Sequence, residues 1–248
     1  MIRVFENLES LSRAAAGVVA DLAKGAVHSR GRFSVALSGG NTPRCLYEIL
    51  AGAPFRDKIQ WQHVHVFWGD ERCVPADDPR SNFRMAREAL LDHIPLPAEN
   101  IHAVRGDLPP AQAAADYEND LQKFFGDEGP AFDLILLGLG ANAHTASLFP
   151  HTPVLYETKR WIAEVYVPEL DMYRVTFTAP LINQAEQVVF LVSGADKAIA
   201  LQNVLEGAYH PDEFPAQLIR PKGVHPLWLV DKAAGHKLAA PIEEDEKE

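Results

Sequence analysis

One stretch of the chain decides its fold: FDLILLGLGANAH, residues 132–144. Its apolar first half, residues 132–137, has the length and character of a buried β-strand. Gly138 and Gly140 then allow a sharp turn at the carboxyl end of that strand. Ligands bind at the carboxyl ends of strands in open α/β sheets, and histidine can transfer protons near neutral pH. We therefore predict that His144 lies at the start of a helix, beside a functional site.

Strands and helices alternate on both sides of this stretch. Further buried strands are predicted at residues 33–37, 64–68, 188–192 and 226–230. Helices are predicted at residues 8–22, 42–50, 83–91, 113–124 and 196–206, and those at 8–22 and 113–124 are amphipathic. The helix at 42–50 is expected to have Thr42 as its N-cap and Pro43 as its first residue. Two more strands, at 162–167 and 174–178, resemble an antiparallel excursion.

This alternation predicts the fold class. It indicates an α/β protein with a mostly parallel, open, Rossmann-like sheet covered by helices on both faces, plus the small antiparallel excursion. Connections are short and no linker is visible, so residues 1–242 are expected to form a single domain. Residues 243–248 form an acidic tail that we expect to be disordered.

Composition excludes several classes of function. The net charge of -11 argues against a nucleic-acid partner, although a pocket on an acidic protein can still be locally basic. The two cysteines do not suggest a disulfide framework. No apolar run approaches membrane-spanning length, and the N-terminus lacks the pattern of a signal peptide. We therefore expect a cytoplasmic protein without a membrane partner, either a monomer or a small homo-oligomer.

Polar or glycine-rich segments follow four of the predicted strands, at residues 38–43, 69–72, 140–144 and 193–197. The carboxyl ends of parallel strands share one edge of the sheet, so these segments are expected to converge there. The first of them is a candidate phosphate cradle, because glycines expose backbone N–H groups and a helix N-terminus favours an anion. It lacks the Gly-Lys-Ser/Thr ending of a Walker loop and is not a dinucleotide fingerprint.

Charged side chains complete the candidate site. Arg72 is placed to bind an oxyanion, and Asp70 to bind a sugar hydroxyl or a catalytic proton. Arg174 and Lys197 are further candidates for an anionic group, since guanidinium and ammonium groups pair well with phosphate. The alternative for each is a solvated surface charge. His63 and His65 share one face of a strand, but no third ligand has a telling spacing, so no metal site is predicted.

At these residues the chain resembles the 6-phosphogluconolactonases, whose wider superfamily also holds glucosamine-6-phosphate deaminases and sugar-phosphate-sensing regulator domains. The segments that carry the resemblance span nearly the whole chain: residues 38–43, 68–72, 81–82, 144–150, 174–176, 197–198, 215–216 and 228–234. The run at 144–150, His-Thr-Ala-Ser-Leu-Phe-Pro, is highly specific in combination with the others. One departure is that the family more often has Asp-Gly before the histidine, where this chain has Asn142-Ala143.

The resemblance implies hydrolysis of a 6-phosphorylated sugar lactone in the oxidative pentose phosphate pathway, without metal or organic cofactor. His144 is then the general base on water, and Arg72 or backbone N–H groups stabilise the oxyanion. Residues implied to bind the substrate and its phosphate are Gly39, Gly40, Asn41, Thr42, Arg44, Arg174 and Lys197. The alternatives are an amino-sugar-phosphate deaminase or isomerase, which Asn142 disfavours because the deaminases are expected to need an acid there, and a sensing domain without turnover.

Overall fold

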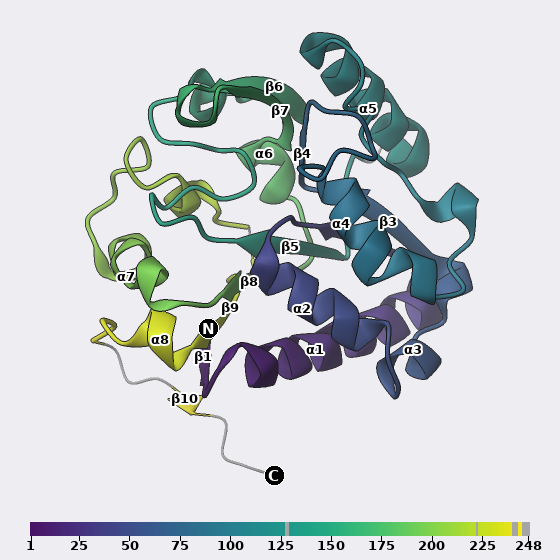
Figure 1. Cartoon of the computed structure of the whole chain (residues 1–248), viewed down its shortest axis with the longest axis horizontal. Coiled ribbons are helices and arrows are strands. Elements are labelled where there is room, and N and C mark those ends of the chain that lie inside the picture. Colours follow the sequence, from purple (N-terminus) through teal and green to yellow (C-terminus); the bar gives the residue numbers. More distant parts are fainter. Residues whose placement is uncertain (127–128, 222, 240–242, 245–248) are drawn as a thin grey trace.

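The computed structural model describes residues 1–126, 129–221, 223–239 and 243–244 (Figure 1). Its strands are β1 (Ile2–Phe5), β2 (Phe33–Leu37), β3 (Val64–Trp68), β4 (Asp70–Arg72), β5 (Leu134–Gly138), β6 (Ile162–Val167), β7 (Met172–Phe177), β8 (Val188–Val192), β9 (Leu227–Asp231) and β10 (Glu243–Glu244). Its α-helices are α1 (Leu8–Arg30), α2 (Asn41–Leu50), α3 (Phe55–Lys58), α4 (Asn82–Ala89), α5 (Pro110–Phe125), α6 (Ala179–Ile182), α7 (Ala198–Glu206) and α8 (Lys232–Gly235).

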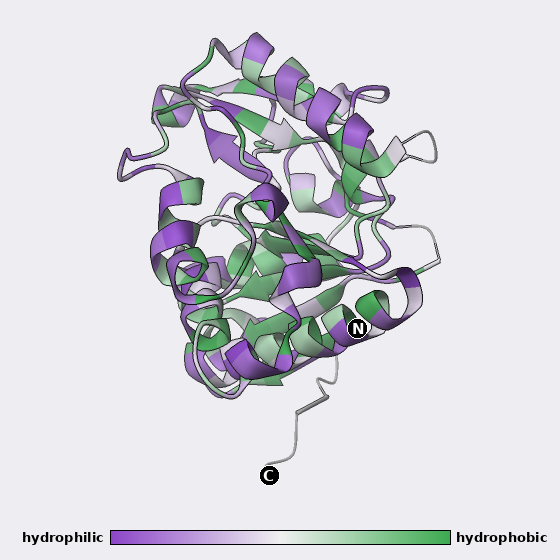
Figure 2. Ribbon diagram, turned by 90° about the vertical axis from the view of Figure 1, so that its right-hand side faces the viewer, coloured by the Kyte–Doolittle hydropathy of each residue, from purple (hydrophilic) through white to green (hydrophobic). Residues whose placement is uncertain are grey.

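A parallel sheet forms the centre of the molecule. Among the described residues it has seven strands in the order β10-β1-β9-β8-β5-β2-β3, and every pair is parallel. The five residues of β2 and the five of β8 are all buried, as expected for strands covered on both faces. Figure 2 shows these central strands coloured as hydrophobic, while the helices around them carry hydrophilic outer faces.

Alternate side chains of the sheet supply two separate cores, one on each face. Val35, Leu134 and Leu136 pack with α1, α2 and α4, whereas Ala36 and Ile135 face α5, α7 and α8. This division follows from the pleat, which points successive side chains of a strand to opposite faces. The predicted doubly covered parallel sheet is therefore confirmed.

A small antiparallel sheet with strand order β4-β7-β6 packs beside α5, above the large sheet in Figure 1. Its hairpin of β6 and β7 confirms the predicted antiparallel excursion. Its third strand, β4, was expected only as a polar strand end. Gly69 separates β3 of the large sheet from β4 of the small one, so the chain passes from one sheet to the other within a single residue.

Two local predictions need correction, at His144 and at the start of α2, and one strand was not predicted. His144 does not begin a helix: residues 139–150 form turns, in which Ala143 and Ala146 have left-handed backbone angles (φ 62° and 47°) that a right-handed helix excludes. Thr42 is not the N-cap of α2 and Pro43 is not its first residue, because that helix already begins at Asn41 after Gly40. Strand β1 was missed; its four residues are too few to show a period beside the following helix.

The predicted tail falls mostly outside the described residues. Glu243–Glu244 pair in parallel with β1 as the short strand β10. Residues 240–242 and 245–248 are not described. The domain boundary at residue 242 therefore stays a prediction.

Candidate active site

The four polar strand ends meet around one pocket of about 390 Å³. Its lining residues are Ser38, Gly39, Gly40, Asn41, Thr42, Pro43, Asp70, Arg72, Asn82, Gly138, Leu139, Gly140, His144, Thr145, Ala146, Arg174, Leu191, Ser193, Asp196 and Lys197. The expected convergence at the carboxyl edge of the parallel sheet is thus observed. Segments from both sheets line the pocket, since Asp70, Arg72 and Arg174 come from the small sheet.

The turn between β2 and α2 leaves a helix N-terminus open at this pocket. Gly40 adopts φ 109° and ψ 173°, a conformation essentially restricted to glycine, and no described side chain caps the helix. The phenol of Tyr47 holds Ser38, at the start of this turn. Its oxygen accepts from the Ser38 N–H (3.0 Å) and donates to the Ser38 carbonyl (2.8 Å). The result is a rigid turn with unfilled backbone donors, which suits an anion.

The N-terminus of α4, by contrast, is already occupied by a carboxylate. Buried Glu71 accepts hydrogen bonds from the backbone N–H groups of Asn82 (2.8 Å) and Phe83 (2.7 Å) and from the Ser81 hydroxyl (3.1 Å). Burial raises the pKa of Glu71, and these N–H donors oppose that rise. A bound phosphate would therefore meet the open end of α2 rather than the filled end of α4.

Asp70 links the loops around the pocket. Its Oδ2 accepts from the Ser147 hydroxyl (2.6 Å) and from Nη1 of Arg174 (3.3 Å). The Asn82 amide donates to the Asp70 carbonyl (2.9 Å) and to Oδ1 (3.3 Å). Asp70 is only 5% exposed, so this carboxylate holds β4, β7 and the His144 loop together. Its contacts are those of an organising group, although it lines the pocket as predicted.

Among the described residues, three cations line the pocket. Burial lowers the pKa of Arg174, which is 8% exposed and forms the ion pair with Asp70. Arg72 donates from Nη1 to the carbonyl of Arg80 (2.6 Å), and Lys197 pairs with Asp196 (2.9 Å). Asp70 and Asp196 also line the pocket, so three cations and two carboxylates give it a formal net charge of +1 on a chain of net charge -11. The pocket is therefore slightly positive on an acidic chain, a charge balance that can accept an anion.

His144 is held through one ring nitrogen. Its Nδ1 lies 2.5 Å from Oδ1 of Asn142, which also accepts from the His144 backbone N–H (3.3 Å). An amide oxygen only accepts hydrogen bonds, so Nδ1 carries the proton and Nε2 keeps its lone pair. The imidazole stacks on Phe149 with 4.0 Å between ring centroids. Burial lowers the pKa of His144 to about 4, and the neighbouring Arg174, Lys197 and Arg72 add to this effect against the opposing charge of Asp70.

Four buried polar atoms at the pocket have no hydrogen-bond partner within the described residues: Ser38 Oγ, Arg72 Nε, Asn82 Oδ1 and Arg174 Nε. Buried polar groups are normally paired, so these four atoms are exceptions that lie on residues lining the pocket. Asn82 was not among the predicted site residues, although residues 81–82 carry part of the resemblance. Its position follows from Ser81, which caps α4 through the Arg84 N–H and so turns Asn82 toward Asp70.

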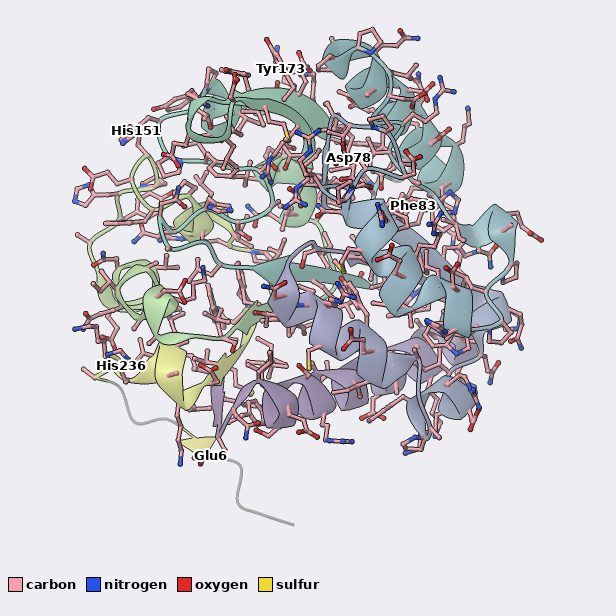
Figure 3. The ribbon with its side chains drawn as sticks, viewed as in Figure 1. Glu6, Asp78, Phe83, His151, Tyr173 and His236 are labelled. Atoms are coloured by element: carbon pink, nitrogen blue, oxygen red, sulfur yellow. The ribbon has the colours of Figure 1, made fainter. Side chains whose placement is uncertain are left out.

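The other predicted residues fall into two groups. Gly39, Asn41 and Thr42 line the pocket, but Arg44 is not among the lining residues, and its exposed guanidinium pairs with Glu48 (3.0 Å). A role for Arg44 in phosphate binding stays a prediction that this geometry does not support. His151, seven residues beyond His144, lies at the periphery of the molecule in Figure 3 and pairs with Asp212 (2.9 Å).

The described residues offer neither a metal-binding cluster nor a membrane-spanning helix. In this part of the chain, no three or more His, Cys, Asp or Glu residues are grouped so as to hold a metal ion. His65 instead faces His102, with 3.2 Å between Nδ1 and Nε2. No described helix combines the length and the apolar character needed to cross a membrane.

Comparisons with known proteins place the chain in a family. Residues 6–228 match the family model of glucosamine-6-phosphate isomerases/6-phosphogluconolactonase. A 6-phosphogluconolactonase from Synechocystis sp. is 50% identical over 218 residues, which cover 86% of this chain and 88% of that protein. One from Nostoc sp. is 49% identical over 219 residues, with the same two coverages, 86% and 88%. The solved structure of the 6-phosphogluconolactonase from Trypanosoma brucei is 30% identical, with a TM-score of 0.84 and coverage of 96% and 98%. The chain therefore belongs to the glucosamine-6-phosphate isomerase/6-phosphogluconolactonase family.

Proposed function

We propose that the chain is a 6-phosphogluconolactonase that hydrolyses 6-phospho-D-glucono-1,5-lactone to 6-phosphogluconate, with His144 as general base. Relatives of that name reach 50% identity over 86% of the chain. The observation that carries the mechanism is the bond between Asn142 Oδ1 and His144 Nδ1, because it leaves Nε2 able to accept a proton at the pocket.

The 6-phosphate is assigned to the turn between β2 and α2. The N-terminus of α2 is uncapped by any described side chain, and Lys197 adds a positive charge from the turn after β8. The filled N-terminus of α4 offers no comparable site. A phosphate held here fixes one end of the substrate, so the lactone end extends toward the His144 loop, which lines the same pocket.

Hydrolysis then proceeds by proton transfer through His144. Nε2 takes a proton from water as the water oxygen bonds to the lactone carbonyl carbon. The tetrahedral oxyanion receives hydrogen bonds from Arg72, whose Nε–H is otherwise unpartnered among described residues. As the bond from this carbon to the ring oxygen breaks, Nε2 returns the proton to that oxygen, which becomes the new hydroxyl group. Asn82 Oδ1 accepts from a sugar hydroxyl, and Asp70 positions the surrounding loops.

The test is hydrolysis of freshly made lactone, with the spontaneous rate subtracted. General acid–base catalysis contributes roughly 10²–10⁴-fold, so His144→Ala should lose turnover by about that factor. It should still bind 6-phosphogluconate, because the phosphate and hydroxyl contacts remain. His151→Ala is the matched control, since this exposed histidine is outside the pocket.

Two results would contradict the proposal. Full activity of His144→Ala would remove His144 as the base. Absence of lactone hydrolysis by the wild-type protein, with release of ammonia from glucosamine 6-phosphate, would instead identify an amino-sugar-phosphate deaminase.

A further inference from the structure

A carboxylate from the connection between β6 and β7 reaches the His144 loop. Glu169 lies in the short 3₁₀ helix η6 (Pro168–Leu170), which joins β6 to β7. Its Oε2 accepts a hydrogen bond of 3.4 Å from Nδ2 of Asn142. Asn142 in turn contacts His144 through its Oδ1. The side chains of Glu169, Asn142 and His144 therefore form a continuous series that ends at the pocket.

This series fixes which way the Asn142 amide faces. On one side the Glu169 carboxylate can only accept a hydrogen bond, so it requires the NH₂ group of the amide. On the other side the His144 backbone N–H can only donate, so it requires the amide oxygen. Both constraints select the same orientation, and that orientation places Oδ1 against His144 Nδ1.

An asparagine needs such a constraint more than an aspartate would. Both carboxylate oxygens of an aspartate accept hydrogen bonds, so rotation of that group leaves an acceptor at Nδ1. Rotation of the Asn142 amide would present NH₂ to Nδ1, which would then become the acceptor and move the ring proton to Nε2. A neutral imidazole with its proton on Nε2 has no lone pair there for water.

We propose that Glu169 is a positioning residue for His144: it holds the Asn142 amide so that the neutral imidazole keeps its proton on Nδ1 and its lone pair on Nε2. The kinetic consequence rests on the proposed function, but the tautomer itself does not. Glu169 is exposed and its hydrogen bond is long, so its contribution is modest. The backbone N–H of His144 supplies the other constraint and remains in any Glu169 variant.

The experiment compares Glu169→Ala and Glu169→Gln with Glu213→Ala, each in the wild-type and Asn142→Ala backgrounds. Glu213 is a matched control because it is also exposed and lines the same surface pocket as Asn142 and Glu169. Two readouts are used: kcat and KM for the lactone, and the ¹⁵N chemical shifts of the His144 imidazole above pH 7. These shifts distinguish a protonated from an unprotonated ring nitrogen and require no turnover.

In the wild-type background, Glu169→Ala should lower kcat about threefold with KM unchanged, the size expected for one exposed hydrogen bond. The same variant should move the ¹⁵N shifts toward a mixture of the two tautomers. Glu169→Gln should restore most of both readouts, because its amide oxygen can still accept from Asn142. Glu213→Ala should change neither. In the Asn142→Ala background, Glu169→Ala should have no further effect on kcat.

Two outcomes would overturn the proposal. One is an unchanged imidazole spectrum in Glu169→Ala, which would mean that the carboxylate does not set the tautomer. The other is an equal loss of kcat in both backgrounds, which would mean that Glu169 acts without Asn142. If the wild-type protein does not hydrolyse the lactone, the proposed function fails, and the ¹⁵N spectra alone decide the role of Glu169.

Discussion

Replacement of Gly140 by alanine tests the position of the base directly. A Cβ atom built at Gly140 would lie 2.1 Å from Nδ1 and 2.2 Å from Cε1 of His144, whereas real Cβ contacts essentially never fall below 3.0 Å. The imidazole would have to move by about 1 Å, and displacement of a catalytic group by this much can reduce the rate about 10²-fold. The ring is confined by its stack on Phe149 and by its bond to Asn142, so this movement breaks the contact that keeps the proton on Nδ1 and the lone pair on Nε2.

We therefore expect Gly140→Ala to lower kcat for lactone hydrolysis about 10²-fold while the affinity for 6-phosphogluconate changes little. The assay is the initial rate with the spontaneous rate subtracted, paired with calorimetric titration of the product to show that the variant is folded. Gly17→Ala, on α1 and outside the pocket lining, is the control, because no described heavy atom lies within 4 Å of a Cβ built there and its backbone is not left-handed. Wild-type kcat in Gly140→Ala would refute the assignment of His144 as base.

Two further predictions concern the same pocket. Asn142→Asp places a carboxylate at His144 Nδ1, and its negative charge stabilises the imidazolium. In the wild type the acid limb of the pH–rate profile is expected near the His144 pKa of about 4. In the variant this limb should lie about 1–3 pH units higher. The rate is lost as pH falls through the pKa, so the variant should lose activity at a higher pH than the wild type, and coincident profiles would contradict the cause given for the shift. Gly39→Ala would bring a Cβ to 1.8 Å from Asn82 Oδ1 and should weaken 6-phosphogluconate binding by about tenfold or more in calorimetry, whereas unchanged affinity would remove Asn82 from the substrate contacts.

The sequence predicts the parallel sheet and the pocket well because both depend on local signals. Continuous apolar runs such as Val188–Val192 specify strands buried on both faces, and polar segments after such strands must meet at one edge. For this reason the convergence of His144, Arg72 and Lys197 on one pocket follows from the order of strands and polar segments along the chain.

Other features depend on contacts between distant residues, which no local pattern reports. The helix expected at His144 is absent because left-handed turns and the hydrogen bonds of Ser147 to Asp70 (2.6 Å) and Thr176 (3.0 Å) hold this loop against the small sheet. Glu71 could not be recognised as an acceptor at the N-terminus of α4, since Asn82 and Phe83 lie more than ten residues away in the chain. Glu169 reaches Asn142 across 27 residues, and nothing in the sequence marks that approach.

The position of β1 in the large sheet has a consequence for how the protein is made. The described strands on either side of β1 are β9 and β10. Strand β1 is synthesised before the other strands of this sheet, yet both of these partners lie more than two hundred residues further along the chain. At about 5–20 residues per second, synthesis of the intervening chain takes roughly 10–45 s. During that time Ile2–Phe5 lacks both strands with which it pairs, and parallel pairing between distant segments is intrinsically slow. Completion of the sheet is therefore expected only after β9 has left the ribosome, and the nascent chain must keep this apolar strand from other partners until then.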